Sequence, residues 1–365
     1  MTGKICIIIG TRPEIIKMSP VVRVCEQRGL DWFMIHTGQH YSYNMDRAFF
    51  EQLKLPDARY NLDVGSGSGG HGEQTGRMLA GIEEVLIKEE PGAVLVEGDT
   101  NTVLAGALAA SKLGIKVGHV EAGLRSYDRR MPEEINRVVA DHISDYLFAP
   151  TVRSRDILLG EGVSDEKVFV TGNTVVDAVY QNRGIANDGG ETLESICGAG
   201  LDLEPNRYLL ATAHRQENVD DAVRFAGILK GLELISDEFS LPVIYPTHPR
   251  SRKMMEEFSL DAVGVTFIEP LDYLSFLKLE ADARLVLTDS GGVQEETCIL
   301  NVPCVTLRDN TERPETAMVG ANVLVGVDPG KILEGARVML DRARDWENPF
   351  GDGRAGERIV SITIG

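Results

Sequence analysis

The sequence lacks three features that would each point to a particular class of protein. Its 365 residues hold 37 Lys and Arg against 56 Asp and Glu, so the net charge is 37 − 56 = −19 and no general basic face is available for nucleic acid or an anionic membrane. No run approaches the roughly 18 apolar residues of a transmembrane helix. The N-terminus has neither the apolar run nor the cleavage site of a signal peptide, so we expect a cytoplasmic protein.

Cysteine is also scarce, and its pattern excludes further classes. The five cysteines are odd in number and show no Cys-x-x-Cys spacing, so we expect neither a disulfide framework nor a zinc or iron–sulfur site. Cys6, Cys298 and Cys304 lie in or beside apolar runs, which favours buried, reduced thiols over reactive ones. We therefore predict that the protein binds no metal.

What the sequence does contain is a regular alternation of short Val- and Ile-rich runs with amphipathic helical segments. Runs of this kind without period-two alternation are typical of strands buried on both faces of a parallel sheet. The predicted strands of the first half are Ile5–Ile9, Trp32–His36, Ala93–Val96, Val117–Val120, Tyr146–Ala149 and Val168–Val170. Those of the second half are Tyr208–Ala213, Val243–Tyr245, Val265–Ile268, Leu285–Thr288, Cys304–Leu307 and Val323–Val325. The predicted helices include Pro13–Gln27, Thr100–Leu113 and Glu133–Ile143.

A pause in this alternation divides the chain. The glycine-rich stretch from about Gln181 to Asn206 is typical of a linker or peripheral loop with a short helix. We therefore predict an α/β protein with two doubly wound, Rossmann-like domains, over residues 1–180 and 181–345, and a site in the cleft between them. The run Gly65–Gly72 indicates a surface loop rather than a phosphate cradle, because no strand directly precedes it.

Charged residues, histidines or glycines follow nearly every predicted strand of the two halves. Because ligands of wound sheets bind beyond the carboxyl ends of the strands, we expect a site there. Arg12 and Lys17 follow the first strand and suit an anionic group. Asp99 is either a functional carboxylate or only the N-cap of the next helix. Glu121 is hard to explain by packing, since it closes an apolar strand beside Gly123.

The helix that begins near Met131 carries two Glu in its first turn. Stabilisation of the helix dipole explains them without chemistry, and Glu133 and Arg137, four residues apart, could simply pair on the surface. In the second half, His214 and His248 follow predicted strands, and for each we weigh a functional role about equally against an ordinary hydrogen bond.

The turn Thr288-Asp289-Ser290-Gly291-Gly292 is the most informative local feature. A strand leads into glycines and then into a helix, so backbone N–H groups are available for a phosphate. Glu296, one turn later, is placed to accept both hydroxyls of a ribose, and Arg313 would add a cation for phosphate. Phosphate and ribose together predict a nucleotide in the second domain, while the absence of a Walker motif argues against ATP hydrolysis.

These motifs, taken together, resemble the non-hydrolysing UDP-N-acetylglucosamine 2-epimerases. The matching stretches occur in order along almost the whole chain. They are Gly10–Glu14, Gly98–Thr100, Gly118–Arg125, Pro132–Glu134, Asn136–Arg137, Thr171–Thr174, His214–Arg215, Thr288–Gly292, Gln294–Glu296, Thr311–Glu315 and Asn348–Gly353.

The resemblance implies a fold of the glycosyltransferase B type, in which the segment 346–365 packs back on the first domain. It implies reversible conversion of UDP-N-acetylglucosamine to UDP-N-acetylmannosamine, by anti elimination of UDP to 2-acetamidoglucal and syn re-addition. No cofactor is needed, and the family suggests a homodimer.

The resemblance also assigns residues. It implies that the catalytic residues are Asp99, Glu121, Glu133 and His214. The implied substrate-binding residues are Arg12, Lys17, Arg137, Phe276, Ser290, Gly291, Gly292, Glu296 and Arg313. A site for activation by substrate would involve Gln39, His40, Gln74 and Arg77.

Two positions depart from the family pattern. Glu97 stands where many relatives have His or Gln and adds a negative charge near the site, and Leu271 replaces a Gln on the uracil side. A UDP-sugar glycosyltransferase, a hydrolysing 2-epimerase and a nucleotide-sugar sensor without chemistry are the alternatives. The preferred acylated UDP-hexosamine stays open, a 2,3-diacetamido sugar included.

Overall fold

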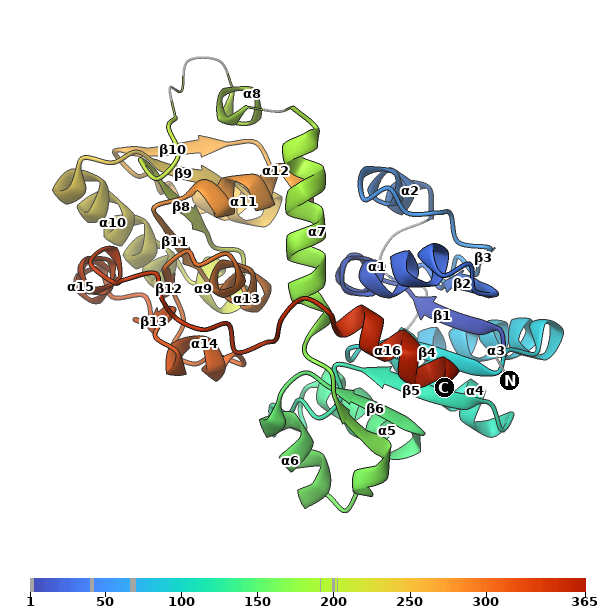
Figure 1. Cartoon of the computed structure of the whole chain (residues 1–365). Coiled ribbons are helices and arrows are strands. Elements are labelled where there is room, and N and C mark those ends of the chain that lie inside the picture. Colours follow the sequence, from blue (N-terminus) through green and yellow to red (C-terminus); the bar gives the residue numbers. More distant parts are fainter. Residues whose placement is uncertain (1–2, 40–42, 66–69, 191, 199–200, 202) are drawn as a thin grey trace. The chain divides into compact units, whose positions relative to one another are not determined.

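A computed structural model describes residues 3–39, 43–65, 70–190, 192–198, 201 and 203–365, with side chains from 47 onward in the second of these ranges. The chain divides into two compact units. Unit 1 comprises residues up to Gln181 together with Phe350–Gly365, and unit 2 comprises Asn182–Pro349. Each unit is a parallel sheet flanked by helices (Figure 1).

The sheet of unit 1 has the strand order β3-β2-β1-β4-β5-β6-β7, and its pairings are parallel. Its strands are β1 Ile5–Ile9, β2 Trp32–His36, β3 Tyr60–Asn61, β4 Ala93–Glu97, β5 Lys116–Val120, β6 Tyr146–Ala149 and β7 Val168–Val170. All five residues of β1 and all five of β4 are buried, because helices cover both faces of the sheet. The order reverses between β1 and β4, which is where wound sheets bind ligands.

The helices of unit 1 include those between its strands and two that follow the last strand. They are α1 Arg12–Gln27, α2 Tyr43–Gln52, α3 His71–Glu89, α4 Asn101–Lys112, α5 Pro132–Ile143, α6 Val152–Gly160, α7 Thr174–Asp188, which continues into unit 2, and α16 Ala355–Ile364. The C-terminal helix α16 lies beside α1 in Figure 1. Asp177 of α7 fixes the first turn of α16 by accepting hydrogen bonds from the backbone N–H groups of Ala355 and Gly356, at 3.1 and 2.9 Å.

Unit 2 repeats the same arrangement with one strand fewer. Its sheet order is β10-β9-β8-β11-β12-β13, also parallel, and the reversal falls between β8 and β11. The strands are β8 Leu209–Thr212, β9 Val243–Pro246, β10 Val265–Ile268, β11 Leu285–Thr288, β12 Cys304–Thr306 and β13 Asn322–Leu324. The helices are α8 Leu193–Cys197, α9 Gln216–Val219, α10 Ala222–Phe239, α11 Pro249–Phe258, α12 Tyr273–Asp282, α13 Gly291–Ile299, α14 Pro314–Met318 and α15 Pro329–Leu340.

The predicted fold class of two Rossmann-like sheets is confirmed, and every predicted strand is present within two residues of its expected ends. Two details were wrong. The two-residue β3 has too little sequence to give a signal, and α7 continues to Asp188 through the start of the supposed linker, in which α8 is the predicted short helix. Of the glycine-rich run, residues 66–69 lie outside the described residues, and His71 already begins α3.

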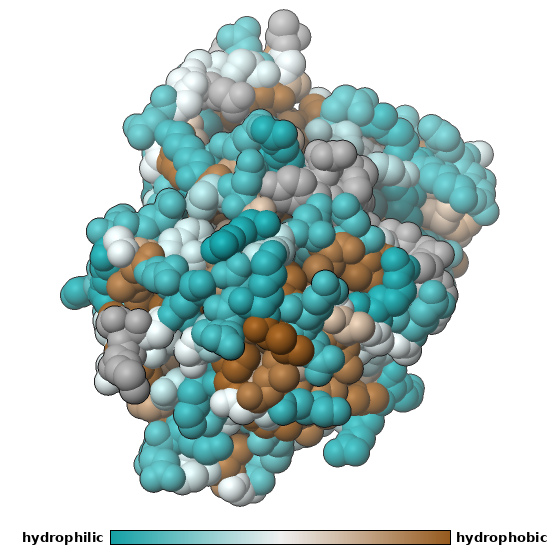
Figure 2. All heavy atoms as spheres, turned by 90° about the vertical axis from the view of Figure 1, so that its right-hand side faces the viewer, coloured by the Kyte–Doolittle hydropathy of each residue, from teal (hydrophilic) through white to brown (hydrophobic). Residues whose placement is uncertain are grey.

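The surface carries both polar and apolar residues. The face shown in Figure 2 is mostly hydrophilic, with apolar areas between the polar ones. Within the described residues, no helix combines the length and apolar character needed to cross a bilayer. All five cysteines are buried and free, which confirms the prediction made for Cys6, Cys298 and Cys304, and burial raises the pKa of Cys25, Cys298 and Cys304 to about 12.

Candidate active site

The turn after β1 is held together by the buried carboxylate of Glu14. The backbone N–H groups of Gly10 and Thr11 donate to its Oε2 at 2.5 and 3.0 Å, and the Thr100 hydroxyl donates to its other oxygen. Burial raises the pKa of Glu14 to about 7 against these hydrogen bonds. A Cβ at Gly10 would lie 2.1 Å from the Thr37 hydroxyl oxygen, so this glycine is required by packing. Glu14 thereby ties the start of α1 to the loop after β4.

Lys17, one turn into α1, bridges two carboxyl groups. Its Nζ donates to Glu121 Oε2 at 2.6 Å and lies 3.1 Å from Glu97 Oε1. Glu121 has a positive φ of 68°, an uncommon conformation for a residue with a side chain. Asn173 donates to the other oxygen of Glu121 at 3.2 Å. Glu121 is thus held from two sides, and its unusual backbone agrees with a position shaped for function rather than packing.

Asp99 pairs with Arg137 of α5, and the backbone O of Asp99 accepts from Asn136 at 2.9 Å. Thr100, not Asp99, is the N-cap of α4, so the capping explanation for Asp99 is wrong. The surface pair of Glu133 with Arg137 does not form either, because Arg137 contacts Asp99 and Glu134. Glu133 is half-buried in the first turn of α5, and its side chain makes no hydrogen bond or ion pair with the described residues.

A buried ionic cluster lies behind these residues. His119 Nδ1 lies 2.7 Å from Asp141, and His119 Nε2 lies 2.8 Å from the backbone O of Gly98. Arg125 Nη1 lies 2.7 Å from the same Asp141, and the side chains of His119, Asp141 and Arg125 are at most 1% exposed. Burial opposes the charged form of His119, yet Asp141 raises its pKa overall. Sequence inspection singled out none of these contacts.

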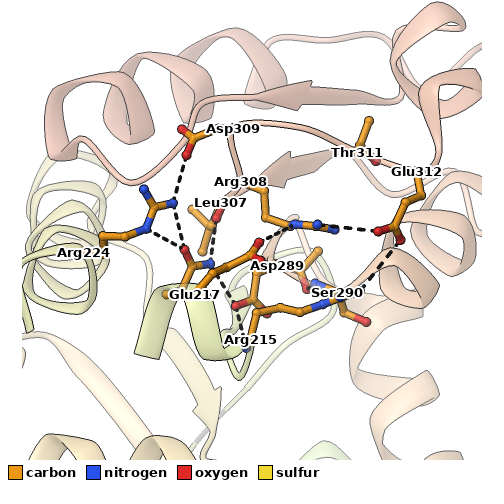
Figure 3. Close-up of polar contacts among 12 residues, drawn as sticks. Arg215, Glu217, Arg224, Asp289, Ser290, Leu307, Arg308, Asp309, Thr311 and Glu312 are labelled. Carbon is orange, nitrogen blue, oxygen red and sulfur yellow. Dashed lines mark hydrogen bonds and ion pairs between the residues drawn. The ribbon is translucent and has the colours of Figure 1, made fainter. Parts of the chain in front are cut away.

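In unit 2, Asp289 organises the ends of β8, β11 and β12 (Figure 3). It accepts from the backbone N–H groups of His214 and Arg215 at 3.1 and 3.0 Å, and from the Asn218 amide at 3.0 Å. The same amide nitrogen donates to the backbone O of Leu307, also at 3.0 Å. Asp289 is fully buried, so its part is to hold the surrounding loops rather than to meet a substrate.

In the neighbouring Ser-Gly-Gly turn, the backbone N–H of Ser290 donates to the Thr288 hydroxyl at 3.0 Å, and two glycines follow at the start of α13. Ser290 is the N-cap of α13 and makes no side-chain capping hydrogen bond. A Cβ at Gly291 or Gly292 would meet no atom closer than 3.7 Å, so the protein's own packing does not demand glycine at either position. Close approach of a ligand to the backbone is a reason for glycine there, and free N–H groups at a helix start favour an anion.

Glu296 belongs to a second cluster of carboxyl groups. It interacts with the carboxyl of Glu280 and the hydroxyl of Tyr273, both on α12, and Tyr273 also interacts with Asn182. Glu280 is fully buried, and burial followed by the charge of Glu296 raises its pKa well above the usual range. Phe276, one turn along α12, is half-buried against the core of this unit.

Two arginines and two histidines at the strand ends of unit 2 already contact other side chains. Arg313 Nε lies 2.8 Å from Glu295, so the predicted phosphate cation already has a partner. Arg308 donates to Glu217 at 3.0 Å and approaches Glu312 at 3.6 Å (Figure 3). The His214 ring lies 5.7 Å from that of His248, and burial lowers the pKa of His214, which favours a neutral imidazole.

Of the residues predicted for an activator site, the two glutamines make hydrogen bonds within the protein and Arg77 is exposed. Gln39 is buried and accepts from the backbone N–H and hydroxyl of Thr102 at 3.0 and 2.9 Å. Gln74 donates to the backbone O of Gln39 at 3.1 Å, whereas Arg77 is exposed on α3 and His40 lies outside the described residues. Both glutamines therefore have a structural task, and activation stays a prediction.

Two positions gained importance only in the structure. Glu97 was noted merely as an extra negative charge, yet it is 2% exposed and in contact with Lys17. Glu280 carried no sequence signal, because a glutamate in the middle of an amphipathic helix is usually solvated. Arg12, by contrast, is where it was expected, at the exposed start of α1 with its guanidinium 5.8 Å from the Phe49 ring. In the described part of the chain, no three His, Cys, Asp or Glu side chains are arranged to hold a metal ion.

Comparison with known proteins places this geometry in context. A family profile for UDP-N-acetylglucosamine 2-epimerase matches residues 23–363. A UDP-N-acetylglucosamine 2-epimerase from Methanocaldococcus jannaschii is 55% identical over 364 residues, covering 98% of each chain. A UDP-2,3-diacetamido-2,3-dideoxy-D-glucuronate 2-epimerase from Pseudomonas aeruginosa is 45% identical and also covers 98% of each. A crystal structure of the Methanocaldococcus jannaschii protein with UDP-GlcNAc and UDP has a TM-score of 0.85, covering 98% of this chain and 99% of that one.

Proposed function

This chain belongs to the UDP-N-acetylglucosamine 2-epimerase family, and we propose that it is a non-hydrolysing isomerase that interconverts UDP-N-acetylglucosamine and UDP-N-acetylmannosamine. The observation that carries this proposal is the contact of Lys17 with Glu121, beside the Asp99–Arg137 pair, at neighbouring strand ends of a wound sheet. Carboxylates and cations together suit a reaction that removes a proton and releases a diphosphate.

The proposed elimination breaks two bonds and forms two, the second being the O–H bond of the carboxylate that accepts the C2 proton. The C1–O bond breaks and its electron pair leaves with UDP, while the C2–H bond breaks and its electrons form the C1=C2 double bond of 2-acetamidoglucal. The C2 proton is not acidic by itself, because no carbonyl lies next to C2. Positive charge that develops at C1 as UDP departs makes a carboxylate an adequate base. Re-addition of UDP, with a proton delivered to the other face of C2, gives the epimer.

Each unit has its own part in this proposal. In unit 1, Asp99, Glu121 and Glu133 are the candidates for the base, the acid and the group that stabilises charge at C1. Arg12, Lys17 and Arg137 would balance the diphosphate and the carboxylates. Arg137 reaches Asp99 in the protein as it stands, which supports a positioning part for that arginine.

In unit 2, the open Ser290-Gly291-Gly292 turn supports a diphosphate site, because helix N-termini bind phosphate without any net positive charge on the protein. Glu296 would accept the ribose hydroxyls and Phe276 would pack against the base. Arg313 would have to exchange Glu295 for a phosphate oxygen, whereas a neutral His214 would donate one hydrogen bond to the leaving phosphate.

Incubation with UDP-N-acetylglucosamine alone tests the proposal. We expect the two epimers to reach an equilibrium without any acceptor and without accumulation of free UDP. Turnover only after an acceptor is added would identify a glycosyltransferase. Free N-acetylmannosamine together with UDP would identify a hydrolysing epimerase, and tight binding without any conversion would identify a sensor.

The 45% identical relative named for a 2,3-diacetamido glucuronate sugar makes that substrate a second candidate. The same assay with UDP-2,3-diacetamido-2,3-dideoxy-D-glucuronate decides between them by the ratio of the two kcat/KM values. The 55% identical relative favours UDP-N-acetylglucosamine. A cytoplasmic homodimer completes the proposal, and analytical ultracentrifugation of the full chain tests its oligomeric state.

A further inference from the structure

Three charged side chains meet at the carboxyl ends of β4 and β5 in unit 1. The Lys17 ammonium lies 2.6 Å from Glu121 and 3.1 Å from Glu97. The side chains are nearly withdrawn from solvent, with 16% of Lys17, 2% of Glu97 and 5% of Glu121 exposed. After burial, the neighbouring Glu121 carboxyl raises the pKa of Glu97, both by its charge and through a hydrogen bond between the two side chains. One ammonium therefore serves two buried carboxyl groups.

The hydrogen bonds divide unequally between the two carboxyl groups. Glu121 accepts from Lys17 and from Asn173, at 2.6 and 3.2 Å. Glu97 Oε1 is buried and, although Lys17 is near, no donor of the described residues is aligned to it. A buried carboxylate oxygen without a donor is costly, whereas a neutral carboxyl in that place is not. Two neighbouring carboxyl groups also retain a proton between them, because their like charges disfavour ionisation of both.

The other charged groups around Glu97 also favour a proton on Glu97 rather than on Glu121. Glu14 faces it from α1 and adds negative charge, while His119 of β5 is engaged with Asp141. Burial, which is the largest influence, raises the pKa of Glu97 well above its usual range. Lys17 opposes this, and Glu121 and Glu14 add to it. Geometry and charge thus both favour a proton on Glu97.

We propose that Glu97 is a positioning residue that stays a neutral carboxylic acid, shares its proton with the Glu121 carboxylate, and so keeps the group of Lys17, Glu97 and Glu121 at zero net charge for a diphosphate substrate. This inference deepens the proposed function and rests on it. In the neutral group, Glu97 donates a hydrogen bond that fixes the orientation of Glu121. With Glu97 ionised, the group carries a net charge of −1, the hydrogen bond is lost, and a diphosphate is repelled.

The direction of the pH effect follows from the proton. Glu97 is protonated at low pH and loses its proton as pH rises through its raised pKa. In the wild-type protein, KM for UDP-N-acetylglucosamine should therefore increase on the alkaline side, by up to about tenfold per pH unit beyond that pKa. In Glu97→Gln, an uncharged amide replaces the titrating group, and this alkaline increase in KM should disappear. Glu84→Gln, which removes an exposed glutamate of α3, is the matched control and should keep the wild-type profile.

A second measurement does not depend on turnover. In protein labelled with ¹³C at the glutamate carboxyl carbon, the Glu97 signal is assigned by its loss in Glu97→Gln or in Glu97→Asp, whichever variant folds. We expect that signal to have the chemical shift of a protonated carboxyl at neutral pH and to titrate only at alkaline pH. A carboxylate shift at neutral pH would overturn the inference, as would an unchanged alkaline limb of KM in folded Glu97→Gln. If wild-type protein converts no UDP-sugar at any pH, the proposed function fails, and the carboxyl signal still decides the state of Glu97.

Discussion

The two units share one sheet order but use glycine differently at the point where that order reverses. In unit 1, Gly10 is required by the protein, since a Cβ there would come within 2.2 Å of the hydroxyls of Thr37 and Thr102. In unit 2, Gly291 and Gly292 have space for a Cβ. A glycine that packing does not explain indicates close approach of a ligand, so the second turn is the better candidate for a binding surface.

The two units also differ in what surrounds the charged side chains at their strand ends. The strand ends of unit 1 carry ionisable side chains in contact with one another, as in Lys17 with Glu121 and Arg137 with Asp99. Unit 2 also contains ion pairs, such as Arg313 with Glu295, but its central carboxylate, Asp289, is held by backbone N–H groups and an amide, with the His214 ring nitrogen 3.5 Å away. Unit 1 therefore supplies groups that can exchange protons and stabilise charge, while unit 2 supplies a fixed frame for recognition. Variants in each unit should separate catalysis from binding.

The largest expected effect is on catalysis from unit 1. Glu121→Gln removes the carboxylate held by Lys17 and Asn173, and kcat should fall about 10²- to 10⁴-fold, as is usual for loss of an acid–base group. The affinity for UDP measured by calorimetry should not fall, because the substitution removes a negative charge beside Lys17 and leaves unit 2 unchanged. If kcat of Glu121→Gln equals that of the wild type, Glu121 is neither the acid nor the base of the reaction.

The next effect is on the stability of unit 1. Asp141→Asn removes the buried counter-charge of His119 and one of the two carboxylates that pair with Arg125, the other being Glu161, and should lower the free energy of unfolding by about 3 kcal/mol. Lys116→Gln, which breaks the exposed pair with Asp145, is the control and should cost under about 1 kcal/mol. Equal losses in urea unfolding would show that the buried cluster is not special.

A smaller effect is expected on binding in unit 2. Gly291→Ala should fold normally because its Cβ meets no close neighbour, yet it should weaken UDP binding by about tenfold, near 1.4 kcal/mol. The value of kcat at saturating substrate should stay close to that of the wild type. Unchanged UDP affinity in this variant would contradict the comparison between the two glycine turns.

The smallest effect concerns the pH dependence of stability. Burial acts to raise the pKa of Asp141, but His119 and Arg125 lower it overall. The ionised Asp141 therefore contributes to the free energy of unfolding above the ordinary Asp range, and this contribution is lost as pH falls through the lowered native pKa. Protonated His119, whose pKa is raised, contributes fully to the free energy of unfolding below about pH 6.5, and this contribution is lost as pH rises through the raised native pKa. Unfolding free energies of Asp141→Asn should vary less over both ranges than those of the wild type.

The sequence predicted the fold closely because buried parallel strands leave a strong signal. The runs at Ile5–Ile9 and Leu285–Thr288 match the observed strands residue for residue. Strand ends also predicted where the charged side chains would gather, since all strands of a parallel sheet point the same way. The two-residue β3 and the continuation of α7 depend on tertiary packing, which local sequence does not record.

The partners of individual site residues could not be predicted in the same way. Arg313 was expected to face a phosphate, yet it reaches Glu295, and Arg137 pairs with Asp99 across 38 positions of sequence. Such contacts follow from side-chain orientation after the chain has folded. The burial of Glu97 likewise follows from the packing around β4, because a glutamate at a strand end is equally compatible with exposure.

The central claim is that this chain removes and replaces the proton at C2 of a UDP-N-acetylhexosamine. Incubation with UDP-N-acetylglucosamine in D2O, followed by proton NMR of the recovered nucleotide sugars, tests it most directly. We predict deuterium at C2 of both epimers at equilibrium, with UDP regained by the sugar. Recovery of UDP-N-acetylglucosamine without deuterium would contradict the claim, even if the protein binds that sugar tightly.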